Sequence, residues 1–226
     1  QVIGADVVNT QGVLQAGQAL VLEQALVTGD GQLLSSKDLT LGLRGGYTQQ
    51  SQGQLRASGE LAVVSTGDVT NQGKILAGTG LRVQARNVDN QHGAELSSVG
   101  TTRLEAQQQV VNRGLVDGAT TQVQAQHIDN VGEGRIYGDH VVLQAQRLDN
   151  RAEVVEGNQR SATIAAREQL DIAAQEVHNS GGSTLLSLGG MRLAAGLDAQ
   201  GQATQGQAQV FKNTGSLVEV HGDAQW

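Results

Sequence analysis

The sequence of 226 residues contains no cysteine and no proline, and aromatic residues make up only 2% of it. Without cysteine, neither a disulfide nor a thiolate metal site can form. Without proline, every backbone N–H is available to donate to a sheet ladder, which favours a chain built largely of strands. A single globular core normally contains more large aromatic side chains than this. The composition therefore predicts a narrow interior filled by Leu, Val, Ile and Ala.

Long apolar runs and positive charge are also lacking. No stretch approaches 18 consecutive apolar residues, so the sequence predicts no membrane-spanning segment and no membrane insertion. The formal net charge of −7 argues against nucleic acid or an anionic membrane as a partner. The chain starts at Gln1 without a basic and apolar leader and stops at Trp226 without a capping element. We therefore expect residues 1–226 to form a single segment of a longer repeat array.

One short pattern recurs along the chain. The segments Gly78–Asn90, Gly118–Asn130 and Gly138–Asn150 all contain alternating apolar residues and end in Asp-Asn, and the last two begin 20 residues apart. Alternation with a period of two places the apolar side chains on one face of a strand. A unit of about 20 residues made of such strands cannot bury its apolar face alone, so successive units must stack.

The fold that satisfies this pattern is all-β: a right-handed parallel β-helix, a solenoid of coils of about 20 residues each. With about 4.8 Å between coils, about ten coils form a rod of roughly 50 Å. Two segments, Arg151–Arg167 and Gly189–Gln209, lengthen the interval between successive repeats. Because a stacked interior cannot absorb extra residues, we expect both to be extruded as loops or hairpin arms.

Asparagine recurs about once per coil, mostly with a glycine two to four residues later, and Thr28 takes its place in the second coil. The apolar residue two positions earlier points inward, so the asparagine should point inward as well. Amides carry both donors and an acceptor, so stacked asparagines can hydrogen-bond along the rod axis. We favour this structural ladder over a row of ligands for a metal or a sugar. Its predicted members are Asn9, Asn71, Asn90, Asn112, Asn130, Asn150, Asn179 and Asn213.

Acidic residues on the outer surface offer an alternative, because some parallel β-helices are polysaccharide lyases or hydrolases. Asp89, Asp129 and Asp149 occupy outward positions, and the last two lie one coil apart. Paired carboxylates can raise each other's pKa or bind a cation. The structural interpretation, which we favour, is a solvated surface balanced by Arg86 and Arg147. We therefore predict no catalytic residue, no metal site and no cofactor.

Histidine and the scattered aromatic residues also fit structural roles. The five histidines lack the HExxH spacing, and a zinc site requires three or four converging ligands, so we expect surface side chains. Phe211 precedes Asn213 by two residues and should fill the core where the second insertion rejoins the rod. The histidines are His92, His127, His140, His178 and His221.

The segment Val7–Leu22, VVNTQGVLQAGQALVL, follows the pattern V-x-N-x-x-G-x-L-x-A-x-x-x-L-x-L, and Val69–Asn90 follows it equally well. This pattern resembles the haemagglutinin repeat of two-partner-secreted exoproteins, the family of filamentous haemagglutinin and of CdiA-type contact-dependent growth inhibition proteins. The resemblance covers nearly the whole chain, although the secretion domain and toxin segment of whole family members have no counterpart here.

The resemblance implies a secreted β-helical filament that an outer-membrane partner transporter exports to the bacterial cell surface. It further implies adhesion, with a receptor or glycan on the target cell, or contact-dependent toxin delivery. We therefore expect a stalk or adhesin segment without catalysis of its own. The alternative is a carbohydrate-active β-helix enzyme. Any binding activity is expected in the two insertions.

Overall fold

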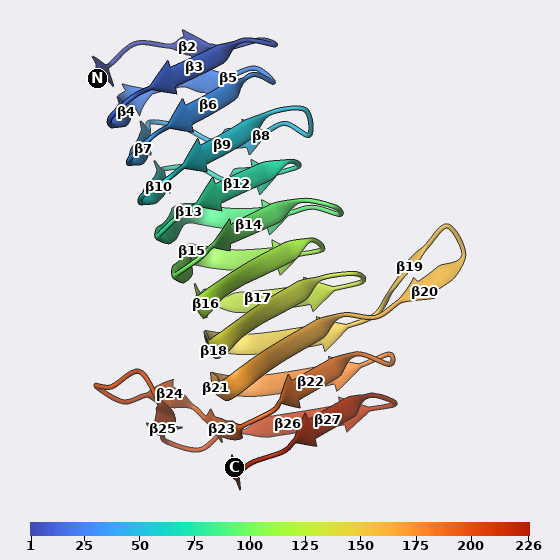
Figure 1. The fold of residues 1–226 in the computed structure, drawn as a ribbon. Helices are drawn as coiled ribbons and strands as arrows, with labels where there is room; N and C mark the ends of the chain where they lie inside the picture. The colour runs from blue at the N-terminus through green and yellow to red at the C-terminus, as the bar shows by residue number, and fades with distance from the viewer.

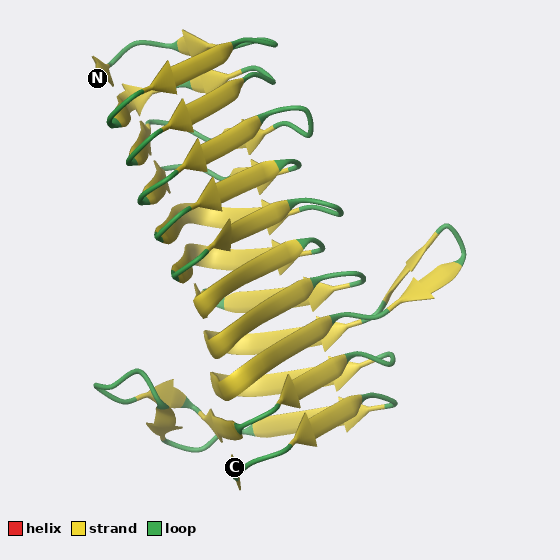
Figure 2. Ribbon diagram, viewed as in Figure 1, coloured by secondary structure: helices red, strands yellow, loops and turns green.

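The computed structural model describes residues 1–226, and all its regular elements are β-strands (Figure 2). The chain winds as a right-handed parallel β-helix of about nine turns, with about 21 residues in each (Figure 1). The two termini lie at opposite ends of the stack (Figure 1). None of the elements is a helix of the length and apolarity needed to cross a membrane. The predicted fold class is confirmed.

Each coil contributes a strand to three parallel faces, which we call faces A, B and C in the order in which the chain reaches them after residue 12. Between Gly80 and Ser180, strands of neighbouring faces merge through the corners into long strands. The long strands are β13 (Gly80–Asn90), β15 (Thr101–Asn112), β16 (Leu115–Gln124), β18 (Arg135–Arg151) and β21 (Thr163–Ser180).

The shorter strands belong to one face each. Face A holds β3 (Val13–Ala16), β6 (Gln32–Ser35), β9 (Gln54–Ala57), β12 (Lys74–Ala77), β14 (Glu95–Ser98), β22 (Thr184–Ser187) and β27 (Leu217–Val220). Face B holds β1 (Val2–Ile3), β4 (Leu20–Ala25), β7 (Leu39–Leu43), β10 (Leu61–Ser65), β23 (Gly190–Ala194) and β28 (Ala224–Gln225). Face C holds β2 (Val7–Val8), β5 (Val27–Thr28), β8 (Tyr47–Gln49), β11 (Val69–Asn71), β17 (His127–Val131) and β26 (Val210–Thr214).

The core is a set of aliphatic columns that run along the rod axis. On face A, Ile75 pairs with Leu96, and Leu96 with Val116, so like side chains stack coil upon coil. Thirty-nine buried residues form one continuous apolar cluster from Leu22 to Leu193. Each such side chain stabilises the fold by about 1.5–3 kcal/mol relative to exposure. Stacking of this kind needs no large aromatic residues, as the composition predicts.

Two segments leave the rod. The hairpin of β19 (Glu153–Val155) and β20 (Asn158–Arg160) is antiparallel and projects from one side of the rod (Figure 1). The second segment, residues 195–209, contains β24 (Gly196–Leu197) and β25 (Ala203–Gln205) and lies on the other side (Figure 1). We call them the hairpin and the arm. Both are shorter than the expected insertions, since β21 resumes the rod at Thr163 and β23 remains in it until Ala194.

Phe211 lies in the inward column where the second insertion rejoins the rod. It pairs in register with Val177, in an inward column of face C, yet it is 37% exposed because it belongs to the last coil. Its ring packs against Trp226 with 4.9 Å between the ring centroids. Phe211 therefore continues the core column of Val177, and its ring is covered by Trp226.

Candidate functional site

A chain of amides runs through the interior along face C. The side-chain nitrogen of each asparagine donates to the side-chain oxygen of the asparagine in the next coil, at 2.8–2.9 Å. Six of the seven residues in this chain are fully buried. In order, they are Asn71, Asn90, Asn112, Asn130, Asn150, Asn179 and Asn213.

The same amides also bind backbone groups near the corner. Asn112, for example, donates to the Arg135 carbonyl at 3.2 Å and accepts from the Gly114 N–H at 3.3 Å. A Cβ added at Gly114 would lie 2.3 Å from the Ala94 carbonyl oxygen and 2.8 Å from the amide nitrogen of Asn90. Glycine therefore follows asparagine because the amide and the turn of the adjacent coil leave no room for a side chain.

The first three coils do not take part in this row of hydrogen-bonded amides. Asn9 donates to the Gln32 carbonyl at 3.0 Å, and it has no asparagine neighbour. Thr28 was expected to take the asparagine position of the second coil. It pairs instead with Val8, and Gly29 is the residue that lies against the backbone of Asn9, so this expectation is wrong. In the third coil Gln49 is in register with Asn71, but its amide donates to the Gln50 carbonyl.

Asp129 and Asp149 are the acidic pair that the sequence places one coil apart, and they are in register. Contrary to the expected solvated surface, both are buried, each 7% exposed. Arg151 donates to both oxygens of Asp129, at 3.0 and 2.7 Å, and Arg147 binds both oxygens of Asp149, at 2.7 and 2.9 Å. Long arginine side chains thus cover the carboxylates and neutralise them.

Asp149 receives one further strong contact, from His127 Nε2 at 2.7 Å. Burial raises the pKa of the Asp149 carboxyl, but hydrogen bonds from Arg147 and His127 outweigh this effect and hold the pKa below its usual range. A general base or acid at neutral pH needs a pKa near 7. Asp149 is therefore poorly suited to proton transfer.

Asp89 is the third acidic candidate, and it does not join this pair. In the preceding coil it is in register with Thr70, and in the following coil with Val111, so no carboxylate lies directly beside it. One carboxylate oxygen accepts from Gln91 Nε2 at 3.2 Å, and the other is buried without a hydrogen-bond partner. Arg86, expected to balance these charges, instead makes two hydrogen bonds of 2.9 Å to Asp68.

The base of the hairpin is fixed to the rod by charged residues from distant coils. Arg113 makes three hydrogen bonds of 3.0–3.2 Å to Glu153, which lies 40 residues later. These hydrogen bonds hold the pKa of Glu153 below its usual range. Arg160 pairs with Glu133 at 3.2 Å, and Gln159 donates to the Gly181 carbonyl at 2.7 Å. The hairpin is thus anchored from coils on both sides.

Each histidine lies beside a carboxylate, at 2.6–3.4 Å. No group of three or more His, Asp or Glu side chains has the arrangement needed to hold a metal ion. His140 is the most informative, because Nε2 contacts Asp171 Oδ2 at 2.7 Å and Asp171 is fully buried. Sequence reasoning did not identify Asp171.

Asp171 anchors the arm to face B. Its second oxygen accepts from the backbone N–H of Ala203, in β25, at 3.0 Å. Ala173, Ala194 and Ala203 form a separate small apolar cluster between the arm and the rod, with Leu197 packed against it. Asp171, Ala173 and Ala194 all occupy outward positions between inward core residues, yet the arm buries them. The arm is therefore folded onto the rod.

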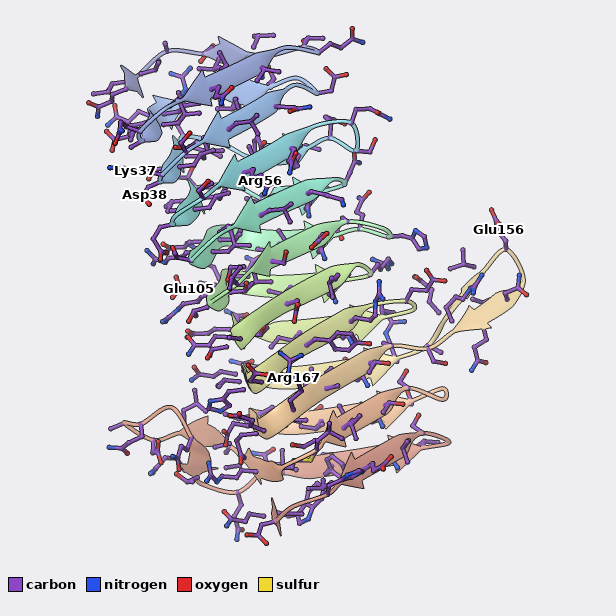
Figure 3. All side chains as sticks on the ribbon, in the orientation of Figure 1. Lys37, Asp38, Arg56, Glu105, Glu156 and Arg167 are labelled. Carbon is purple, nitrogen blue, oxygen red and sulfur yellow. The ribbon has the colours of Figure 1, made fainter.

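A groove of about 680 Å³ runs along the corner between faces A and B. Arg56 and Arg167 line its two ends and lie on the same side of the rod (Figure 3). Ser97 and Asp117 line it between them. The groove is open and contains no cluster of catalytic type.

The sequence profile of the haemagglutinin repeat matches residues 1–42, 23–73, 56–117, 111–156 and 147–218. Among curated proteins, the chain is 29% identical over 183 residues to "Deoxyribonuclease CdiA" of Dickeya dadantii (strain 3937), covering 76% of this chain and 5% of that protein. It is 36% identical over 93 residues to "tRNA nuclease CdiA" of Escherichia coli (strain STEC_O31), covering 41% and 3%.

A second "tRNA nuclease CdiA", from Yersinia mollaretii, is 23% identical over 180 residues, which are 79% of this chain and 6% of that protein. The chain therefore spans only a small part of the curated relatives that it matches. No solved structure matches the chain.

Proposed function

The chain belongs to the haemagglutinin-repeat family, and on this premise we propose that it is a stalk segment of a large secreted exoprotein, without catalysis of its own. The segment holds more distal parts of its parent protein away from the bacterial surface, for adhesion or for contact-dependent toxin delivery. An outer-membrane partner transporter exports the parent. The nuclease activities in the names of the relatives belong to those proteins, of which this chain matches 3–6%.

The observation that carries this proposal is the uninterrupted row of hydrogen-bonded amides from Asn71 to Asn213, of which all but the last are buried. It adds an axial side-chain hydrogen bond between successive coils to the backbone ladders that already connect them. Each coil contacts mainly its neighbours, so the rod can fold coil by coil as a long chain emerges. A structure of this kind transmits force and sets a distance.

The environment of the two buried aspartates also favours a stalk over the enzyme alternative. Asp129 and Asp149 are saturated by arginine hydrogen bonds, and the lowered pKa of Asp149 disfavours a role in proton transfer at neutral pH. We propose that these residues fix the surface of face C and the base of the hairpin. A glycosidase or lyase would need at least one of them free to contact a substrate.

The test uses the parent exoprotein on living cells. Deleting Gly118–Tyr137 removes 20 residues, and joins Asp117 to Gly138 in the register that the adjacent coils already share. We expect surface display and activity to persist on a stalk shorter by one coil, about 4.8 Å. Deleting half a coil, residues 118–127, is the matched control and should abolish display.

A second comparison addresses chemistry. The double variant Asp129→Asn and Asp149→Asn should keep adhesion or toxin delivery whenever its surface level equals that of the unmodified protein. Loss of activity at equal surface level, together with release of reducing ends or unsaturated products from polysaccharides by the unmodified protein only, would establish the enzyme and refute the stalk.

A further inference from the structure

The arm, residues 195–209, is organised internally by one aspartate. Asp198 accepts from the backbone N–H groups of Gln200 and Gln202, each at 2.9 Å, and from the Thr204 hydroxyl at 2.7 Å. The antiparallel pairing of β24 with β25 closes the base of the arm. The arm therefore has contacts of its own that fix its shape.

The two ends of the arm contain glycine. Gly196 begins β24, and Gly206 directly follows β25 with a φ of 70°. Because glycine adopts positive and negative φ at similar cost, these positions can absorb a rotation of the arm about its base. The arm can thus move relative to the rod as one body.

Few contacts hold the arm against face B. The N–H of Gln209 donates to the Gln175 carbonyl where the chain re-enters the rod. Elsewhere a single hydrogen bond joins the arm to the rod, from the Ala203 N–H to Asp171 at 3.0 Å. The other contacts are those of the small alanine cluster described above. Since alanine offers little apolar area, the hydrogen bond to the carboxylate carries a large share of the docking.

Charged groups from two coils face Asp171. Its carboxylate is fully buried, with His140 Nε2 of β18 at 2.7 Å and the Arg192 guanidinium of β23 at 3.5 Å. Arg192 also attracts Asp198, the only charged residue of the arm. Two carboxylates, one beneath the arm and one within it, therefore hold the arm closed.

We propose that the arm is an acid-operated strap. It lies closed on face B while Asp171 and Asp198 are ionised, and it opens as one unit when both are protonated. Protonation weakens the charge-assisted hydrogen bond from Ala203 and removes the attraction to Arg192. Opening exposes the apolar outward residues of face B that the arm covers, Val142, Ala173 and Ala194. This inference goes beyond the stalk and does not depend on it.

The sign of the pH dependence follows from Asp198. Hydrogen bonds from the Gln202 backbone N–H and the Thr204 hydroxyl hold the pKa of its carboxyl below the usual range. Such a carboxyl stabilises the closed arm fully above its ordinary pKa of about 3.9, and this contribution is lost as pH falls through the lower, folded value. Opening is therefore expected below about pH 4.

The test is NMR spectroscopy of the ¹³C-methyl- and ¹⁵N-labelled 226-residue chain from pH 7 to pH 2. We expect the nuclear Overhauser contact between the Ala203 and Ala173 methyl groups to disappear below about pH 4, while the contacts of the rod core persist. At pH 7, the double variant Asp171→Asn and Asp198→Asn removes both charges at nearly constant volume. It should speed amide hydrogen exchange at Ala203 by about tenfold, with exchange at Leu96 in the core changed less than about twofold.

Glu168→Gln is the matched control, because Glu168 is exposed and lies at the corner before face B, away from the arm contacts. It should change exchange at Ala203 less than about twofold. If the double variant does not fold, Asp198→Asn alone replaces it, and faster exchange at Ala203 is again expected.

Unchanged exchange at Ala203 in the aspartate variants would overturn the proposal. A methyl contact that persists at pH 2, or that is lost only together with the contacts of the rod core, would overturn it as well. These results concern the arm alone, and the coil deletion tests the stalk separately.

Discussion

Replacing Asn112 by alanine tests the contribution of the amide chain at its middle. Asn112 is fully buried and makes four hydrogen bonds, two through its nitrogen to Asn130 and Arg135 and two through its oxygen from Asn90 and Gly114. At about 1 kcal/mol net for each bond, alanine should lower the free energy of unfolding by about 3–5 kcal/mol. For a chain of this size the midpoint of thermal unfolding should fall by roughly 10 °C.

The assay is urea denaturation at 25 °C, with amide hydrogen exchange as a local measure, because a solenoid can unfold coil by coil. Asn158→Ala is the control, since Asn158 is exposed at the start of β20 and its side chain makes one hydrogen bond, to the Glu156 carbonyl. It should change the free energy of unfolding by less than about 0.5 kcal/mol. If Asn112→Ala and Asn158→Ala differ by less than about 1 kcal/mol, the amide chain adds nothing to the stack, and our reasoning is wrong.

Three further predictions test other contacts. Gly114→Ala should destabilise the fold by about 1–3 kcal/mol, because the added methyl meets the Ala94 carbonyl, whereas Gly17→Ala has open space and should be neutral in the same urea assay. The lowered pKa of Asp149 means that its contribution is complete above its unfolded pKa of about 3.9 and is lost as pH falls through the folded pKa. The stability difference between the unmodified protein and Asp149→Asn, measured from pH 7 to pH 2, should therefore shrink below about pH 4; a constant difference would contradict this. Arg113→Gln should speed hydrogen exchange in the hairpin, residues 153–160, while changing global stability by less than about 1 kcal/mol; unchanged exchange there would show that the Glu153 pair does not anchor the hairpin.

The architecture could be predicted from the sequence because a repeat makes each residue's surroundings a copy of the previous ones. Alternation fixes which side chains point inward, and the spacing of about 20 residues fixes which coils stack. Leu96, for example, contacts the same kind of neighbour above and below, Ile75 and Val116. The regular part of the interior therefore follows from local pattern alone.

The contacts on the surface do not follow from the repeat, and the sequence predicted few of them. Long arginine side chains can reach from one coil to the next, so the sequence does not determine which arginine covers Asp129. In the structure it is Arg151, 22 residues later. The Arg113–Glu153 contact spans 40 residues and depends on where the hairpin leaves the rod. No period in the sequence marks such pairs, so the acidic residues were expected in solvent and are instead buried.

The arm shows that some of this information was nevertheless present in the alternation itself. A regular coil places polar residues outward, yet Ala173 and Ala194 pair in one outward column of face B, and Val142 occupies the outward column beside it, in register with Asp171. Small or apolar residues at neighbouring outward positions of successive coils predict that another element covers them. The only long insertion that follows is the one that folds back over these residues. Asp171, which is buried among them, binds that insertion by accepting from the Ala203 N–H. In a solenoid, small or apolar residues at outward positions of neighbouring coils are therefore the sign of a docked insertion, and an insertion without such residues, as at the hairpin, projects from the rod.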